Sequence, residues 1–171
     1  FVDLHHHLVY GVDDGARSFE DMQQMMLRAV SENVGDIVCT THGTPGRRAF
    51  PMEIYQRHLE KARDWLRQEG LPLRLHSGCE VLYTDSAARL LKEGEFPTLA
   101  DGWNVLVEFT PDTEFKRLCD AARLIGNAGY NVIFAHVERY QALRNLNHVR
   151  ELRDEYDVYM QMNASTVVMK K

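Results

Sequence analysis

Short apolar segments alternate with longer helical patterns along the chain, and this alternation restricts the fold more than any other feature of the sequence. Six segments rich in β-branched and apolar residues predict strands over residues 2–7, 36–41, 73–79, 104–109, 131–135 and 157–162. Strands that alternate with helices form a mostly parallel sheet, either open or closed into a barrel. Six strand–helix units are fewer than the eight of a complete barrel of about 250 residues. We therefore expect a smaller, distorted barrel, or one whose last strands are missing from this sequence.

The segments between the predicted strands show the periodicity of amphipathic helices. Ser18 and Asp21 resemble a capping box, and apolar residues follow them at helical spacing. Pro51 suits the first turn of a second helix, which we expect to end at Gly70. Further helices are expected over residues 85–92, 113–129 and 145–156. Each predicted helix follows a predicted strand, as a parallel sheet requires.

The composition is that of one soluble globular domain spanning residues 1–171. Hydrophobic residues make up 44% of the chain and charged residues 26%, and no stretch approaches the ~20 apolar residues of a membrane span. The net charge of -5 and the lack of a basic run argue against non-specific binding to nucleic acids. Cys39, Cys79 and Cys119 lie far apart in apolar contexts. We therefore expect buried, reduced thiols in a cytoplasmic protein.

Five successive predicted strands deliver a histidine or a carboxylate to their carboxyl ends. These residues are His5, His6 and His7 on the first strand, followed by His42, Glu80, Glu108 and His136 on the next four. In parallel α/β folds, ligands bind at the edge where the carboxyl ends of the strands meet. We therefore expect these side chains to gather at one edge of the sheet.

The first of these segments places two imidazoles on one side of a strand. Because side chains alternate along a strand, His5 and His7 point the same way and His6 points to the opposite face. Two such imidazoles can share a metal ion, although a His-x-His pair is a weak signal by itself. Asp3 lies on the same face as His5, which makes it a candidate for orienting an imidazole.

Acidic residues supply further candidates for metal binding. Glu108 interrupts an apolar strand, where a buried carboxylate needs either a salt bridge or a metal ion. The same need for a salt bridge or a metal ion applies to Glu80, which we expect to be more exposed. Asp13 and Asp14, in the loop after the first strand, are either turn and capping residues or a source of another ligand. Three histidines without such neighbours are interpreted as surface or packing residues, namely His58, His76 and His148.

Three arginines lie where an anionic substrate would approach this edge. Arg139 follows His136 by three residues, and a guanidinium has the shape that binds two oxygens of a phosphate group. Arg47 and Arg48 lie in the loop after His42. All three are candidate substrate-binding residues, with ordinary solvated charges as the alternative. Mixed histidine and carboxylate ligands suit manganese, iron or zinc, and such ions activate water for the hydrolysis of phosphate esters or, less often, amides.

Several motifs together resemble one known superfamily. They are Asp3-Leu4-His5-His6-His7, Gly11-Val12-Asp13-Asp14-Gly15-Ala16, Thr40-Thr41-His42, Gly78-Cys79-Glu80-Val81, Leu106-Val107-Glu108-Phe109, Ala135-His136-Val137-Glu138-Arg139-Tyr140 and Gln161-Met162-Asn163-Ala164-Ser165. The set resembles the polymerase-and-histidinol-phosphatase (PHP) superfamily. More closely, it resembles the bacterial manganese-dependent protein tyrosine phosphatases of capsule and exopolysaccharide operons. The resemblance covers essentially the whole chain.

This resemblance implies a distorted, TIM-like (β/α)7 barrel with a centre of two or three manganese ions. The resemblance implies that His5 and His7 bind a first ion and that Glu80 bridges it to a second. Glu108 and His136 are the implied remaining ligands of the second ion. The implied ligands of a third ion are His42 and either Asp14 or Asp13. Arg139 is the implied catalytic residue, which binds the phosphoryl oxygens. The implied substrate is phosphotyrosine on the C-terminal tail of a partner tyrosine kinase that controls polysaccharide export.

The sequence departs from the pattern of that superfamily in three respects. Thr41 and Val137 stand where prolines are usual, and Gly43 stands where a second histidine often follows the first. The chain also ends at Lys171 before the Asp-x-His that completes the site in the relatives, so we expect it to lack the C-terminal part of its domain. Two other functions therefore stay open. One is another PHP-type phosphoesterase, such as a histidinol phosphatase or a nuclease-like enzyme, and the other is a degenerate domain that binds metal without turnover.

Overall fold

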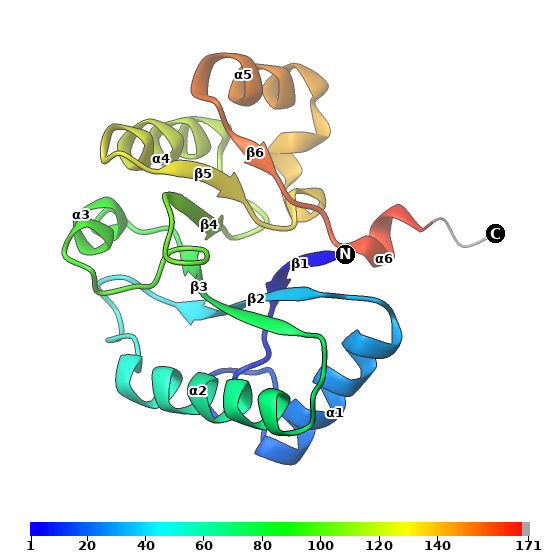
Figure 1. The fold of residues 1–171 in the computed structure, drawn as a ribbon. Helices are drawn as coiled ribbons and strands as arrows, with labels where there is room; N and C mark the ends of the chain where they lie inside the picture. The colour runs from blue at the N-terminus through cyan, green and yellow to red at the C-terminus, as the bar shows by residue number, and fades with distance from the viewer. Residues whose placement is uncertain (169–171) are drawn as a thin grey trace.

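The computed structural model describes residues 1–168, and its centre is one curled sheet of parallel strands with helices packed outside it (Figure 1). The strands are β1 (Val2–His6), β2 (Asp36–Gly43), β3 (Arg74–Leu82), β4 (Asn104–Glu108), β5 (Asn131–Phe134) and β6 (Tyr159–Met160). Each strand pairs with the next strand along the chain, so the sheet order follows the sequence from β1 to β6. The predicted α/β class and parallel sheet are confirmed, and the sheet forms a half-barrel.

The first five helices lie where the sequence pattern predicts them, whereas the last and shortest one was not predicted. They are α1 (Phe19–Ser31), α2 (Met52–Gln68), α3 (Ala87–Lys92), α4 (Phe115–Asn127), α5 (Leu146–Tyr156) and the short α6 (Ala164–Val167). Ser18 caps α1, because its hydroxyl accepts a hydrogen bond from the Asp21 N–H at 3.2 Å. Among the helices of residues 1–168, none combines the length and the hydropathy that crossing a bilayer requires.

Two strands extend further than the sequence pattern indicated. β2 runs to Gly43 and β3 to Leu82, so His42 and Glu80 lie inside strands and not just beyond their ends. Polar residues are unusual inside buried strands because each needs a partner. Here the two residues lie opposite each other in the pairing of β2 with β3, and their side chains partner one another within the half-barrel.

Apolar side chains fill both sides of the sheet. The larger cluster lies between the sheet and the helices and includes Met22 and Met26, which are fully buried. A smaller cluster lines the inside of the curl and consists of Val38, Leu99, Leu106 and Ala135. Val38 and Leu106 of this cluster come before His42 and Glu108 on their strands. Polar side chains therefore lie beyond the apolar cluster, at the carboxyl ends of these strands.

The hydroxyl of Tyr55 on α2 joins β2 to β3, and its removal is expected to destabilise the fold. It donates to the Cys39 carbonyl at 2.8 Å and accepts from the Gly78 N–H at 2.9 Å, and all these atoms are buried. Tyr55→Phe leaves both backbone groups without this partner, so we expect a loss of about 2 kcal/mol of unfolding free energy. For a chain of this size that loss corresponds to a fall in Tm of about 4–8 °C.

Thermal denaturation followed by circular dichroism measures this effect. The matched control is Tyr159→Phe, because the Tyr159 side chain on β6 is 64% exposed and its variant should keep the Tm of the parent. An unchanged Tm for Tyr55→Phe would mean that the Cys39 carbonyl and the Gly78 N–H pair directly in the absence of the hydroxyl.

Candidate metal centre

The histidines and carboxylates predicted at the strand ends converge on the carboxylate of Glu80. Its Oε1 atom lies 2.7 Å from Nε2 of His136. Its Oε2 atom lies 3.1 Å from Nε2 of His5 and 3.2 Å from both Nε2 of His7 and Nδ1 of His42. Only 1% of the Glu80 side chain is exposed. Four imidazoles from three separate segments of the chain therefore take the place of water around this carboxylate.

Glu108 and Asp14 extend the cluster toward the surface. Glu108 lies 3.0 Å from Nδ1 of His42 and 3.6 Å from Nε2 of His136. Asp14 is exposed and lies 3.5 Å from Nε2 of His42. Three groups each hold their donor atoms within 4.8 Å of one another, namely His5, His7 and Glu80; His7, Asp14 and His42; and His42, Glu80 and Glu108. All the predicted metal-binding residues thus lie together, and these three groups have the geometry to hold metal ions.

The register of the sheet explains why these residues meet. β2 and β3 pair so that His42 lies opposite Glu80, and β3 and β4 pair so that Leu82 lies opposite Glu108. Neighbouring strands are about 4.8 Å apart, so polar groups at the same level reach one another. His136 comes two residues after the end of β5 and has a left-handed conformation, with φ +34° and ψ +54°. This turn lets its ring reach back to Glu80.

The arrangement of donor atoms fits a metal ion. The Nε2 atoms of His5 and His7 face each other at 3.3 Å, and both face Oε2 of Glu80. The Nδ1 atom of His7 lies 2.7 Å from the carboxylate of Asp13, and a neutral ring that donates from Nδ1 presents the lone pair of Nε2 to the centre. Lone pairs that converge on a carboxylate oxygen repel one another unless a proton or a cation lies among them. Nitrogen and oxygen donors without thiolates suit manganese, iron or zinc.

The contacts between imidazoles and carboxylates also shift the pKa values in the cluster. Burial by itself would raise the pKa of Glu80, but hydrogen bonds from the surrounding imidazoles hold it well below its usual value. Burial would lower the pKa of His7, but hydrogen bonds to Asp13 and Glu80 raise it to about 10. In the same way, the carboxylates of Glu108 and Glu80 overcome burial and raise the pKa of His136 to about 9. The carboxylates therefore draw positive charge into the cluster, as protons or as metal ions.

Asp13 lies behind the cluster and holds its members in place. Besides the contact with the His7 ring, Asp13 accepts the main-chain N–H of His42 at 3.1 Å and that of Gly15 at 3.0 Å. Its side chain is buried. Of the two acids that the sequence left open, Asp14 therefore lies among the potential ligands, whereas Asp13 orients the groups around them.

The prediction that Asp3 orients an imidazole is wrong, because its side chain bonds to no histidine ring among residues 1–168. Asp3 accepts the main-chain N–H of His5 at 3.1 Å, and an irregularity in β1 between Asp3 and His6 disturbs the simple alternation of faces. The ring of His5 instead contacts Gln161, whose Oε1 atom lies 3.1 Å from Nδ1. The two residues are 156 positions apart. No local pattern marks a glutamine as the partner of so distant a ring, although its segment belongs to a motif that carries the resemblance.

The three histidines interpreted as surface or packing residues contact protein groups outside the cluster. His58 and His148 each stack on an aromatic ring, with centroids 3.7 and 3.8 Å apart. His76 pairs with Asp36 at 2.8 Å. These contacts confirm the interpretation. His6 makes no ion pair with the cluster within the described part of the chain, in line with its predicted position on the other face.

Of the three arginines predicted to bind substrate, Arg139 and Arg48 lie next to residues of the cluster. Arg139 ends the short helix η1 (Val137–Arg139), is exposed and takes part in no ion pair among residues 1–168. Arg48 lines a small cavity of about 90 Å³ together with His42. Arg47 lines a neighbouring cavity of about 310 Å³. Arg139 and Arg48 are therefore the better placed to meet an anion at the cluster.

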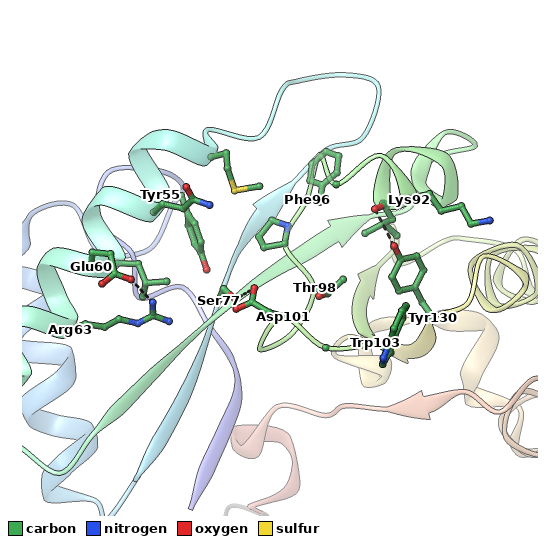
Figure 2. A pocket seen from close by; sticks show the side chains of 17 residues that line it. Tyr55, Glu60, Arg63, Ser77, Lys92, Phe96, Thr98, Asp101, Trp103 and Tyr130 are labelled. Atoms are coloured by element: carbon green, nitrogen blue, oxygen red, sulfur yellow. Dashed lines mark hydrogen bonds and ion pairs between the residues drawn. The ribbon is translucent and has the colours of Figure 1, made fainter.

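Figure 2 shows a separate cavity of about 760 Å³ that includes none of the predicted site residues. It lies between α2, α3 and the loop that leads into β4, and Trp103 and Tyr130 form part of its wall. Ser77 of β3 contributes to it and lies three residues before Glu80. The cavity is therefore closer to the amino end of β3 than the metal cluster is. Size alone would have pointed to the wrong part of the molecule.

Known proteins with similar sequences place the chain in a family. The family model described as "Capsular polysaccharide synthesis, CpsB/CapC" matches residues 1–171. The tyrosine-protein phosphatase CpsB of Streptococcus pneumoniae is 32% identical over 171 residues, covering 99% of this chain and 70% of that protein. This chain belongs to the CpsB/CapC family. The tyrosine-protein phosphatase CpsB of Streptococcus agalactiae is 29% identical over 171 residues, with the same coverage of both chains.

A solved structure shares the fold of this CpsB/CapC chain. It belongs to the crystal structures of YwqE from Bacillus subtilis and CpsB from Streptococcus pneumoniae, described as "unique metal-dependent tyrosine phosphatases". It matches 95% of this chain with a TM-score of 0.85 and 23% sequence identity, and the matched part is 66% of that chain. The half-barrel is therefore the fold of a known structure, and the resemblance to this group of phosphatases is confirmed at the level of the family. The chain spans about two thirds of the length of that structure.

The CpsB/CapC chain has a steric reason for one departure from the expected pattern. A Cβ atom on Gly43 would lie 2.4 Å from Sγ of Cys79 and 2.7 Å from the ring of Phe96. Both neighbours are buried. A second histidine after His42 therefore has no room unless the core beside β2 rearranges.

Proposed function

We propose that this chain is the catalytic part of a metal-dependent protein tyrosine phosphatase. The observation that carries the proposal is the buried carboxylate of Glu80 with four imidazoles from three segments around it. Such a cluster is suited to metal-assisted hydrolysis. The names of the relatives, which are tyrosine-protein phosphatases, support phosphotyrosine as the group that is hydrolysed.

The proposed centre holds two or three manganese ions, with iron or zinc as alternatives that accept the same donors. The proposed ligands are His5, His7 and Glu80 for the first ion; Glu80, Glu108 and His136 for the second; and His42 with Asp14 for the third. The grouping of His5 with His7 and Glu80 supports the first set, and that of Asp14 with His42 supports the third. For the second set, Nε2 of His136 lies 2.7 Å from Glu80 and 3.6 Å from Glu108. Divalent cations held there would acidify water and neutralise the charge that develops on the phosphate oxygens.

The substrate is proposed to reach this centre between the rim arginines. Arg139 carries an exposed guanidinium without an ion pair in residues 1–168, and it is proposed to bind two phosphoryl oxygens. Arg48 and Arg47 are proposed to attract the negatively charged peptide around the phosphotyrosine. We further propose that this peptide is the tail of a tyrosine kinase of polysaccharide synthesis, which the description of the family supports. Three buried cysteines without disulfides support a cytoplasmic setting.

The domain is proposed to close as a (β/α)7 barrel when residues beyond this chain are present. The two free edges of the half-barrel are β1 and β6. Both carry exposed apolar side chains, including Val2 and Leu4 on β1 and Tyr159 on β6, which suit burial by a further strand and helix. The same part of the domain would bring the Asp-x-His that relatives carry.

Hydrolysis assays with purified protein test the proposed function. We expect release of phosphate from a phosphotyrosine peptide when Mn²⁺ is present, and loss of that activity when a chelator removes the metal. Histidinol phosphate and single-stranded DNA serve as competing substrates. Preference for either of them would favour another PHP-type phosphoesterase, and bound metal without any turnover would favour a degenerate domain.

Replacing Arg139 is expected to impair catalysis without loss of metal. Arg139→Ala removes the proposed partner of the phosphoryl oxygens, so we expect kcat/KM for the phosphotyrosine peptide to fall about 100-fold, as for other lost oxyanion donors. Arg144→Ala is the control, because Arg144 is also exposed and lies five residues further along the chain. Steady-state kinetics with Mn²⁺ measure both variants. Equal rates for Arg139→Ala and the parent would remove Arg139 from the proposed mechanism.

A further inference from the structure

The side chain of Gln161 joins two distant members of the metal cluster through a single oxygen atom. Gln161 follows β6, where the chain passes back toward β1 (Figure 1). Its Oε1 atom accepts the main-chain N–H of His136 at 2.7 Å and lies 3.1 Å from Nδ1 of the His5 ring. β1 is at one end of the sheet and β5 near the other. Gln161 therefore connects the two sides of the half-barrel at the level of the cluster.

These contacts determine which way the amide of Gln161 points. A main-chain N–H only donates, so the Gln161 atom that faces His136 must be the acceptor, Oε1. The amide nitrogen, on the other side, donates to Oδ1 of Asn163 at 3.2 Å. Since an amide oxygen only accepts, Nδ1 of His5 must carry a hydrogen. When the ring is neutral, its lone pair is therefore on Nε2, the atom available to a metal ion, which lies 3.1 Å from Oε2 of Glu80.

The backbone of Gln161 holds the turn at His136 as well. His136 has a φ of +34°, in the left-handed region that is unfavourable for residues other than glycine. The carbonyl of Gln161 accepts the N–H of Val137 at 3.0 Å, and the N–H of Gln161 donates to the carbonyl of Phe134 at 2.9 Å. Together with the bond from its side chain, Gln161 therefore contacts the chain immediately before, at and after this strained residue.

We propose that Gln161 is a positioning residue of the metal centre, which sets the tautomer of His5 and the backbone turn of His136 through one amide oxygen. The proposal rests on the proposed function in that it assigns both histidines to metal binding. Neighbours that orient a metal-binding imidazole usually change metal affinity 10–100-fold when they are removed. In this role Gln161 supplies no atom to a metal ion itself, since it acts through the two histidines that it contacts.

Two substitutions separate the oxygen from the bulk of the side chain. Gln161→Leu keeps a similar volume and removes the acceptor, whereas Gln161→Glu keeps an oxygen at the same place. We expect calorimetric titration with Mn²⁺ to show an affinity about 10–100-fold weaker for Gln161→Leu and within about threefold of the parent for Gln161→Glu, since the acceptor is kept. Nitrogen-15 NMR of the metal-free protein should show the Nδ1–H tautomer of His5 in the parent and in Gln161→Glu, and a mixture of tautomers in Gln161→Leu.

The outcomes distinguish this inference from the proposed function. Unchanged affinity and an unchanged tautomer in Gln161→Leu would overturn the inference. So would a Gln161→Glu variant that binds Mn²⁺ as weakly as Gln161→Leu, because the effect would then come from packing. If the parent protein binds Mn²⁺ but releases no phosphate, the proposed function fails while these comparisons still decide the role of Gln161. If the parent protein binds no metal, the NMR measurement of the His5 tautomer by itself tests the role of Gln161.

Discussion

Replacing Glu80 with glutamine is expected to abolish nearly all metal binding and hydrolysis. Among residues 1–168, Glu80 is the carboxylate that contacts four imidazoles, at 2.7–3.2 Å. Loss of a residue that only orients a ligand already costs 10–100-fold in metal affinity. Glu80 lies among the donor atoms themselves, in two of the three groups. We therefore expect the affinity for Mn²⁺ to fall more than about 100-fold, and kcat with it.

Glu80→Gln is expected to have this effect because an amide differs from a carboxylate in charge and in hydrogen bonding. Glutamine has nearly the shape of glutamate, but one of its two terminal atoms is a nitrogen that donates hydrogen bonds and the group has no charge. Either orientation of the amide leaves imidazole nitrogens without their anionic partner in a buried place. The positive charge that the cluster draws in, as protons or as metal ions, then loses its main counter-charge.

Calorimetric titration with Mn²⁺ and hydrolysis of a phosphotyrosine peptide measure the effect. The matched control is Glu53→Gln, because Glu53 is exposed in the first turn of α2, away from the cluster. It should keep the affinity and the rate of the parent. A Glu80→Gln variant that binds Mn²⁺ as tightly as the parent would contradict the proposed metal centre.

Replacing Gly15 with alanine is expected to cause a large loss of stability together with damage to the centre. A Cβ atom on Gly15 would lie 2.0 Å from the carbonyl oxygen of His7 and 2.7 Å from its Cβ. Backbone atoms cannot yield as a flexible side chain can, so the loop after β1 must move. Overpacking usually costs 1–3 kcal/mol, and we expect a value near the upper end, about 3 kcal/mol. The Tm should fall by about 6–12 °C.

The same movement is expected to reach the metal centre. The Gly15 N–H donates to Asp13, and Asp13 in turn contacts the His7 ring and the His42 N–H. Displacing Gly15 pulls Asp13 away from both. We therefore expect the affinity for Mn²⁺ to fall by about 10-fold or more in the variant that remains folded.

Gly126→Ala is the control, and it is expected to change the Tm in the opposite direction. It lies in α4, and a Cβ atom there would meet nothing within 4 Å. Alanine is favoured over glycine in a helix by roughly 0.5–1 kcal/mol, so Gly126→Ala should raise the Tm. Thermal unfolding of both variants measures the contrast. Equal Tm values for Gly15→Ala and the parent would show that the loop after β1 accommodates a side chain without strain.

The order of strands and helices followed from local patterns. Apolar spacing, the cap at Ser18 and the stop at Gly70 depend on residues within one or two turns of each other, and these predictions were confirmed. The ends of β2 and β3 were not predicted correctly. His42 and Glu80 look like residues beyond a strand because they are polar, and only the contact between the two strands makes them acceptable inside one.

The sequence by itself determined which residues are available to the metal centre, because a parallel α/β sheet brings the carboxyl ends of successive strands to one edge. The tertiary structure alone decided how they are held. The wrong assignment of Asp3, the place of Asp13 behind the cluster and the contact of Gln161 with His5 all depend on loop paths and on the curl of the sheet. Local periodicity reflects interactions between near neighbours in the chain, whereas a contact across 156 residues depends on how the whole half-barrel closes.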